Sequence, residues 1–169
     1  MNARTKRIAV CAVMTALSVI CVYLGAVIAT NRLSLTALTT VFTAAAVIES
    51  GRRGGLYVFV ATLILGLTLI PDKALMILYA AFFGYYPVLK SISEALRSRL
   101  AEWVLKLVVF NSAFAFMWLL FKGLFFSAGV FEKNAVLVFS ALNVIFIVFD
   151  IGLSRLIYVY SCRISENLK

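Results

Sequence analysis

Six long runs of uncharged residues place the strongest constraint on how this chain can fold. Each run contains 15 to 24 residues, and about 20 apolar residues suffice for one helical crossing of a bilayer. Lysine and arginine at the ends of the shorter runs can reach toward the headgroups and extend the span. We therefore predict an all-α integral membrane protein with six transmembrane helices and short loops, forming one domain over residues 1–169. The expected helices cover residues 7–29, 34–49, 54–70, 74–90, 102–122 and 134–158.

The composition leaves no room for a water-soluble domain. Apolar residues make up 64% of the chain and charged residues 14%, against about half and about a quarter in an average soluble domain. A separate catalytic or nucleotide-binding domain needs at least about 50 residues in one piece, so energy from ATP must come from a partner. The chain has no histidine, and only one of its seven acidic residues lies well inside an expected helix. We therefore predict no enzymatic activity, no cofactor and no metal site.

The distribution of basic residues predicts the topology. If the N-terminus lies in the cytoplasm, the inner side collects twelve of the sixteen lysines and arginines, as the positive-inside bias of short loops requires. Both termini are then cytoplasmic, and the protein is a multi-pass protein of the cell membrane. Because the charges are dispersed between apolar runs, we expect the lipid bilayer and no nucleic acid as a partner. The four basic residues left outside are Arg32, Lys73, Lys122 and Lys133.

Two connections carry further local signals. Pro71, Asp72 and Lys73 separate two apolar runs so briefly that we expect a tight antiparallel hairpin there, because proline cannot donate a backbone hydrogen bond. Residues 88–106 place apolar side chains at helical spacings of three and four, which predicts an amphipathic helix on the cytoplasmic surface. That helix could be a linker lying on anionic lipid or a docking surface for a partner, and the sequence does not separate the two.

The first expected helix carries small residues on one face, at Ala9, Ala12 and Ala16. The spacing of Ala12 and Ala16 lets another helix approach closely in a bilayer. On spacing alone, packing within the protein's own bundle is the simpler interpretation, and a contact with a partner helix is the alternative. The second helix has a similar run of threonines and alanines that also favours close packing.

The segment from Thr5 to Ser18, with the sequence TKRIAVCAVMTALS, resembles the first helix of the substrate-binding S components of energy-coupling factor (ECF) transporters. The shared features are a basic N-terminus and an A-x-x-x-A motif, together with six helices and no soluble domain over the whole chain. The resemblance implies a subunit that captures a vitamin-like micronutrient from outside the cell. It also implies that the alanine motif packs against a coupling transmembrane protein, which two cytoplasmic ATPases drive.

Polar residues within the expected helices are further candidates, because an intramembrane polar group usually faces protein or a cavity. Asn111 and Asn143 suit either a hydrogen bond between helices or a ligand contact. Asp150 lies toward the inner end of the last helix, where we expect Arg155 to neutralise it in a structural ion pair.

An importer must take its ligand from outside, so we expect a binding site in the outer half. Apolar walls with a few directional polar groups are typical of such sites, although aromatic residues near the interface also belong to the usual aromatic belt. A non-enzymatic membrane scaffold or assembly protein is the alternative function. The predicted ligand-binding residues are Asn31, Arg32, Tyr79, Trp118, Lys122 and Asn143.

Overall fold

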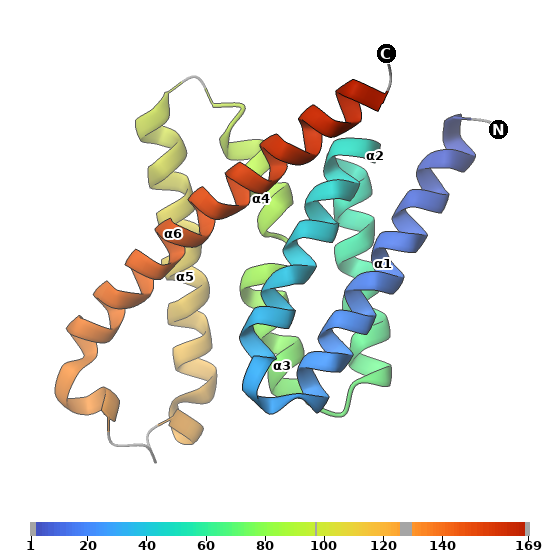
Figure 1. Cartoon of the computed structure of the whole chain (residues 1–169). Coiled ribbons are helices and arrows are strands. Elements are labelled where there is room, and N and C mark those ends of the chain that lie inside the picture. The colour runs from blue at the N-terminus through green and yellow to red at the C-terminus, as the bar shows by residue number, and fades with distance from the viewer. Residues whose placement is uncertain (1–2, 97, 126–129, 168–169) are drawn as a thin grey trace. The chain divides into compact units, whose positions relative to one another are not determined.

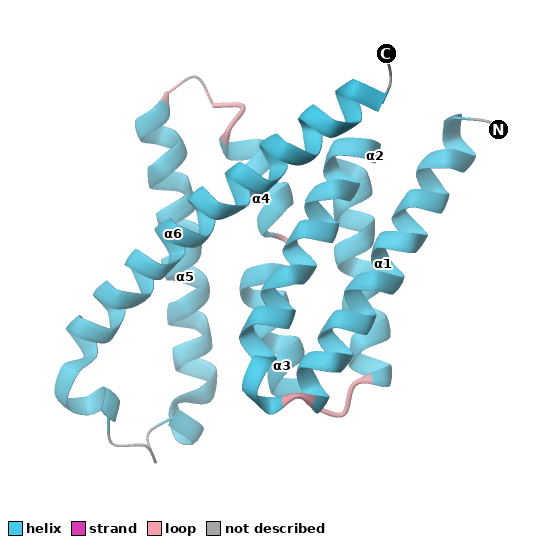
Figure 2. Cartoon of the chain, in the orientation of Figure 1, coloured by secondary structure: helices cyan, strands magenta, loops and turns pink. Residues whose placement is uncertain are grey.

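A computed structural model describes residues 3–96, 98–125 and 130–167, with side chains described except at residues 3, 29, 120–138 and 163–167. The described chain is helical and contains no strand (Figure 2). Five helical stretches are long and apolar enough to cross a membrane. The prediction of an all-α chain built from such helices is confirmed. The stretches are Arg4–Val27, Arg32–Leu69, Lys73–Ser93, Arg99–Leu119 and Phe139–Cys162.

The chain divides into two compact units, Met1–Trp103 and Val104–Lys169. The first unit holds α1 (Ala3–Val27), the short 3-10 helix η1 (Ala29–Asn31) and α2 (Arg32–Leu69). It continues with α3 (Lys73–Leu78), the π-helical turn η2 (Tyr79–Phe83) and α4 (Tyr86–Ser93). The second unit holds most of α5 (Arg99–Phe125) and all of α6 (Val130–Asn167).

The long helix α2 folds back on itself at Gly51, so the expected helices 34–49 and 54–70 are its two arms. Gly51 has φ 80° and ψ 178°, a conformation that is essentially restricted to glycine. A Cβ atom added to Gly55 would lie 2.3 Å from Cγ2 of Val47. In a straight helix, residues eight apart are separated by about 12 Å along the axis, so the two arms must run side by side (Figure 1).

The predicted hairpin at Pro71 is present and short. The second arm of α2 ends at Leu69 and α3 begins at Lys73. The Asp72 side chain caps α3, because its Oδ1 accepts a hydrogen bond from the Leu75 backbone amide at 3.2 Å. Lys73 Nζ donates to the Ile70 carbonyl at 2.9 Å, which satisfies a backbone acceptor at the end of α2.

The prediction of one continuous amphipathic helix over residues 88–106 is wrong. The helix α4 ends at Ser93, and a turn precedes α5 at Arg99. Lys90 and Ser93 are buried rather than on a solvated face. Of the apolar residues that formed the pattern, Ile92, Leu96 and Leu100 are exposed. A helical pattern does not reveal where the chain must turn between two longer helices.

Small and hydroxylated side chains allow the arms of the first unit to pack closely. Most of these hydroxyls bond to carbonyls of their own helix; Thr36 Oγ1, for example, donates to the Arg32 carbonyl at 2.7 Å. Thr40 Oγ1 instead donates to the Phe83 carbonyl at 3.3 Å and so links α2 to η2. The fully buried small and hydroxylated residues of the two α2 arms are Thr36, Thr39, Thr40, Thr43, Ala46 and Thr62.

In the second unit, α5 and α6 pair through side chains that come early in one helix and late in the other. The pairing order shows that these two helices run antiparallel. The pairs are Lys106 with Asp150, Phe110 with Phe146 stacked at 4.3 Å between ring centroids, Asn111 with Asn143, and Phe114 with Phe139 at 5.8 Å between ring centroids.

Candidate functional site

At one end of the first unit, two connections are joined by an ion pair between Arg32 and Asp72. Arg32 opens α2 directly after Asn31, and both residues are exposed. Asp72 was not predicted as a site residue, although it lies in the loop that was expected to share the outer side with Arg32. Because Asp72 also caps α3, Arg32 is held against a fixed carboxylate. A ligand that reached Arg32 would have to share it with Asp72.

Tyr79 lies in the core of the same unit, not on its surface. It packs in a cluster with Val22, Ile70, Leu75 and Met76, all of them buried. The Tyr79 ring stands 6.0 Å from the Phe59 ring, between centroids. It begins the π-helical turn η2, and such turns are frequent at functional sites because they shift side chains and free backbone groups.

The hydroxyl of Tyr79 is fully buried, and so is that of Thr62. Among the described residues, neither makes a hydrogen bond of good geometry, although the hydroxyls of Thr62 and Thr43 lie close to that of Tyr79. A buried hydroxyl without a partner costs free energy, and such groups in a native structure call for an explanation. Thr62 was not a predicted site residue, and no pattern in the sequence pairs it with Tyr79.

Two more predicted ligand residues lie in the second unit. Asn143 Nδ2 donates to Asn111 Oδ1 at 3.1 Å, and Asn111 Nδ2 donates back to Asn143 Oδ1 at 3.2 Å. The amide of Asn143 therefore bonds to a neighbouring helix, which was one of its two predicted roles. Trp118 packs near Phe114, with ring centroids 6.3 Å apart. The side chain of Lys122 lies outside the described residues.

The six predicted ligand residues are therefore divided between two places. Asn31, Arg32 and Tyr79 belong to the first unit, where Arg32 engages a loop carboxylate and Tyr79 lies in the core. Trp118 and Asn143 belong to the second unit.

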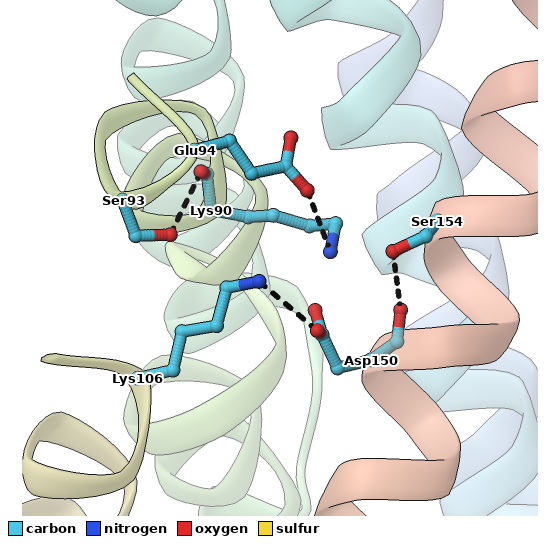
Figure 3. Close-up of polar contacts among 6 residues, drawn as sticks. All are labelled: Lys90, Ser93, Glu94, Lys106, Asp150 and Ser154. Carbon is cyan, nitrogen blue, oxygen red and sulfur yellow. Dashed lines mark hydrogen bonds and ion pairs between the residues drawn. The ribbon is translucent and has the colours of Figure 1, made fainter. Parts of the chain in front are cut away.

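The expected ion pair of Asp150 exists, but its partner is Lys106 and not Arg155. Lys106 Nζ lies 3.0 Å from Asp150 Oδ2, and the two side chains are 1% and 3% exposed (Figure 3). Arg155 is exposed on α6. Sequence separation misled the prediction: Arg155 is five residues away on the same helix, whereas residues that share a helical face are three or four apart. Lys106 comes from the facing helix.

The alanine face of α1 is turned away from the packed core of the first unit. Ala9, Ala12 and Ala16 are all exposed. The residues through which α1 packs are on the other side of the helix, where Thr15, Ser18 and Val22 are buried. Within the first unit, the structure therefore gives no support to the alternative in which the alanines pack inside the protein's own bundle.

Comparison with family models, with curated proteins and with solved structures gave no match for this chain.

Proposed function

We propose that this chain is the membrane-embedded substrate-binding subunit of an ECF-type importer. In this role it captures a vitamin-like micronutrient from outside the cell, and a coupling transmembrane protein with two cytoplasmic ATPases drives uptake. The observation that carries the proposal is the exposed alanine face of α1. It leaves a flat strip of small side chains on the helix whose sequence resembles the family.

A strip of this kind suits a close helix crossing. In lipid, helices associate through packing and not through a hydrophobic driving force, so small residues that bring backbones together favour contact. Ala9, Ala12 and Ala16 lie within two turns of each other and are exposed, with Ile8 and Val13 exposed nearby. A coupling protein would cover this strip in the assembled importer.

The proposed topology has six crossings with both termini in the cytoplasm. The chain reverses at Gly51, which divides α2 into two arms. We count each arm as one crossing. Within the first unit, the end formed by the start of α1 and the Gly51 turn carries Arg4, Lys6, Arg7, Arg52 and Arg53. The other end carries Arg32 and Lys73. This asymmetry agrees with the positive-inside bias.

The ligand would enter from the end of the first unit that carries Arg32 and Lys73. The cation of Arg32 suits a carboxylate-bearing compound, which would compete with Asp72 for the guanidinium. Tyr79 and Thr62 supply buried hydroxyls deeper in the same unit, where the two lie close to each other. The other predicted contacts, Trp118, Lys122 and Asn143, belong to the second unit and stay predictions.

The test is purification of the tagged chain from native membranes. Co-purification of ATPases with a second membrane protein is the expected result. A stable membrane partner without any ATPase would instead favour the alternative function, a non-enzymatic scaffold or assembly protein.

Substitutions on α1 test which surface carries the contact. Ala12→Leu and Ala16→Leu should abolish complex formation and leave the melting temperature of the isolated protein unchanged, because both positions are exposed. Ala115→Leu, the same change on an exposed part of α5, should leave the complex intact. Ala46→Leu adds the same bulk at a fully buried position and should unfold the protein. Complex formation by both α1 variants would remove the alanine face from the proposal.

A further inference from the structure

Three segments of the first unit converge at the end where α1 begins. Ser50 Oγ lies 3.5 Å from the Arg7 carbonyl, which brings the Gly51 turn of α2 against the first turns of α1. Arg52 donates from Nε to Ser91 Oγ at 3.1 Å and from Nη2 to the Ser91 carbonyl at 2.9 Å, which ties the same turn to α4. The turn is therefore held on both sides by hydrogen bonds.

This end of the unit is strongly positive. Five exposed cations form what we call the basic end, and no carboxylate among the described residues makes an ion pair with any of them. Of the acidic residues in the same segments, Glu94 pairs with Lys90 at 2.9 Å. Glu49 is half-buried two residues before Gly51, and no ion pair of it is found within the described part of the chain. The residues of the basic end are Arg4, Lys6, Arg7, Arg52 and Arg53.

Exposed apolar side chains follow these cations closely along the chain. Ile8 follows Arg7 on α1, and Leu56 and Tyr57 follow Arg53 on α2; all three are exposed. A cationic surface bordered by an apolar one matches a molecule with an anionic head and a hydrocarbon tail. A nucleic acid or a soluble anion would use the cations but not the apolar border.

We propose that the basic end binds the phosphate headgroup of an anionic lipid, with the acyl chains lying along Ile8 and Tyr57. Basic clusters at the ends of membrane helices attract anionic lipid, and each lysine or arginine near the surface contributes to the attraction. Arg52 is held by Ser91, so it presents its remaining N–H groups without a large loss of side-chain freedom. The proposal does not depend on the transport function.

The experiment is native mass spectrometry of the purified full-length chain in detergent. Dioleoylphosphatidylglycerol is compared with dioleoylphosphatidylcholine, which has the same acyl chains and no net charge. The chain should retain the anionic lipid in preference, and the preference should weaken as salt is raised. Inorganic phosphate at the same concentration should not displace the lipid, because it cannot occupy the apolar border. Equal retention of the two lipids, or displacement by phosphate, would overturn the proposal.

Variants locate the site. Arg7→Gln with Arg53→Gln should weaken binding of the anionic lipid by about 20-fold or more, since each cation near the surface is worth about fivefold. Arg53→Lys should retain most of the affinity. Arg32→Gln with Lys73→Gln removes the same net charge from the other end of the first unit and should change binding little.

The control also separates lipid binding from general electrostatics. An equal loss in the Arg32/Lys73 variant would mean that net charge and not the basic end decides the affinity, and the proposal would fail. It would also fail if the Arg7/Arg53 variant kept its lipid but lost a co-purifying protein, because the basic end would then be a protein contact.

Discussion

The carboxylate of Asp150 needs a cation because an unpaired charge inside a membrane-spanning bundle is costly. Lys106 satisfies it from the facing helix, and both side chains are almost completely buried. The sequence correctly indicates that Asp150 is paired, because a charged residue at the end of a long apolar run needs a counter-charge. The identity of the partner depends on how α5 and α6 rotate against each other, which the order of residues does not specify.

The pair should be tightly coupled energetically. Asp150→Asn removes the ion pair of the buried Lys106 ammonium with Asp150, and loss of one partner of a buried ion pair costs about 3–5 kcal/mol. Lys106→Met should cost a similar amount. The double variant should lose less stability than the two single variants added together. Thermal unfolding of the purified protein in detergent measures all three.

Arg155→Gln provides the contrast, because Arg155 is exposed and was the partner expected from sequence. Its melting temperature should stay within about one degree of the unmodified protein, as surface substitutions away from special features have little effect. If Arg155→Gln lowered the melting temperature more than Lys106→Met does, Arg155 and not Lys106 would be the partner of Asp150.

At the scale of the element, α2 shows how one residue divides a helix. Its 38 residues would extend about 57 Å if straight, far more than the roughly 30 Å of a bilayer core. The run of Ser50, Gly51, Arg52 and Arg53 interrupts the apolar sequence, and the positive φ of Gly51 reverses the chain. The close fit of Gly55 against Val47 then brings the arms together. Sequence reading predicted two helices here and correctly placed the break.

Gly51→Ala should destabilise the turn although there is space for the methyl group. Nothing lies within 4 Å of the Cβ that it would add, but the backbone there has φ 80°. A non-glycine residue held in such a region costs about 1–3 kcal/mol, which would lower the melting temperature.

Gly152→Ala is the matched control, since Gly152 also has open space around its added Cβ and lies within the regular helix α6. This change should be neutral or should raise stability by up to about 1 kcal/mol. If the two variants melted at the same temperature, the backbone of Gly51 could not be the element that fixes the turn.

At the scale of the whole molecule, the distribution of charge and the reversals of the chain predict the same grouping of connections into two sides. Within the first unit, Arg7 and Arg52 share one end with Ser91, and Arg32 and Asp72 share the other. Alternate connections of the first unit therefore lie at alternate ends of it, which is the arrangement that the proposed topology requires.

Labelling from outside the cell tests this arrangement. In a variant whose native cysteines are replaced by serine, a reporter cysteine at Lys73 should react with a membrane-impermeant maleimide in intact cells. Reporters at Arg52 and Glu94 should react only after the membrane is permeabilised. Labelling of the Arg52 reporter in intact cells would show that the proposed orientation is wrong.

The sequence by itself determined the helical class, the interruption of the apolar sequence at Gly51 and the tight hairpin at Pro71. These are properties of single segments. A run of uncharged residues must satisfy its backbone hydrogen bonds internally in lipid, so it becomes a helix wherever its neighbours lie. The same reasoning found the charged residue Asp150 and indicated that it needed a partner.

Only the tertiary structure decided which side chains meet. Lys106 faces Asp150, Asn111 bonds to Asn143, Tyr79 enters the core, and the alanine face of α1 stays exposed. Each of these depends on the rotation and depth of one helix relative to another. Many rotations of a helix bury similar apolar area, so hydropathy alone does not choose among them. The packing of small residues and the pairing of the few buried polar groups select one rotation.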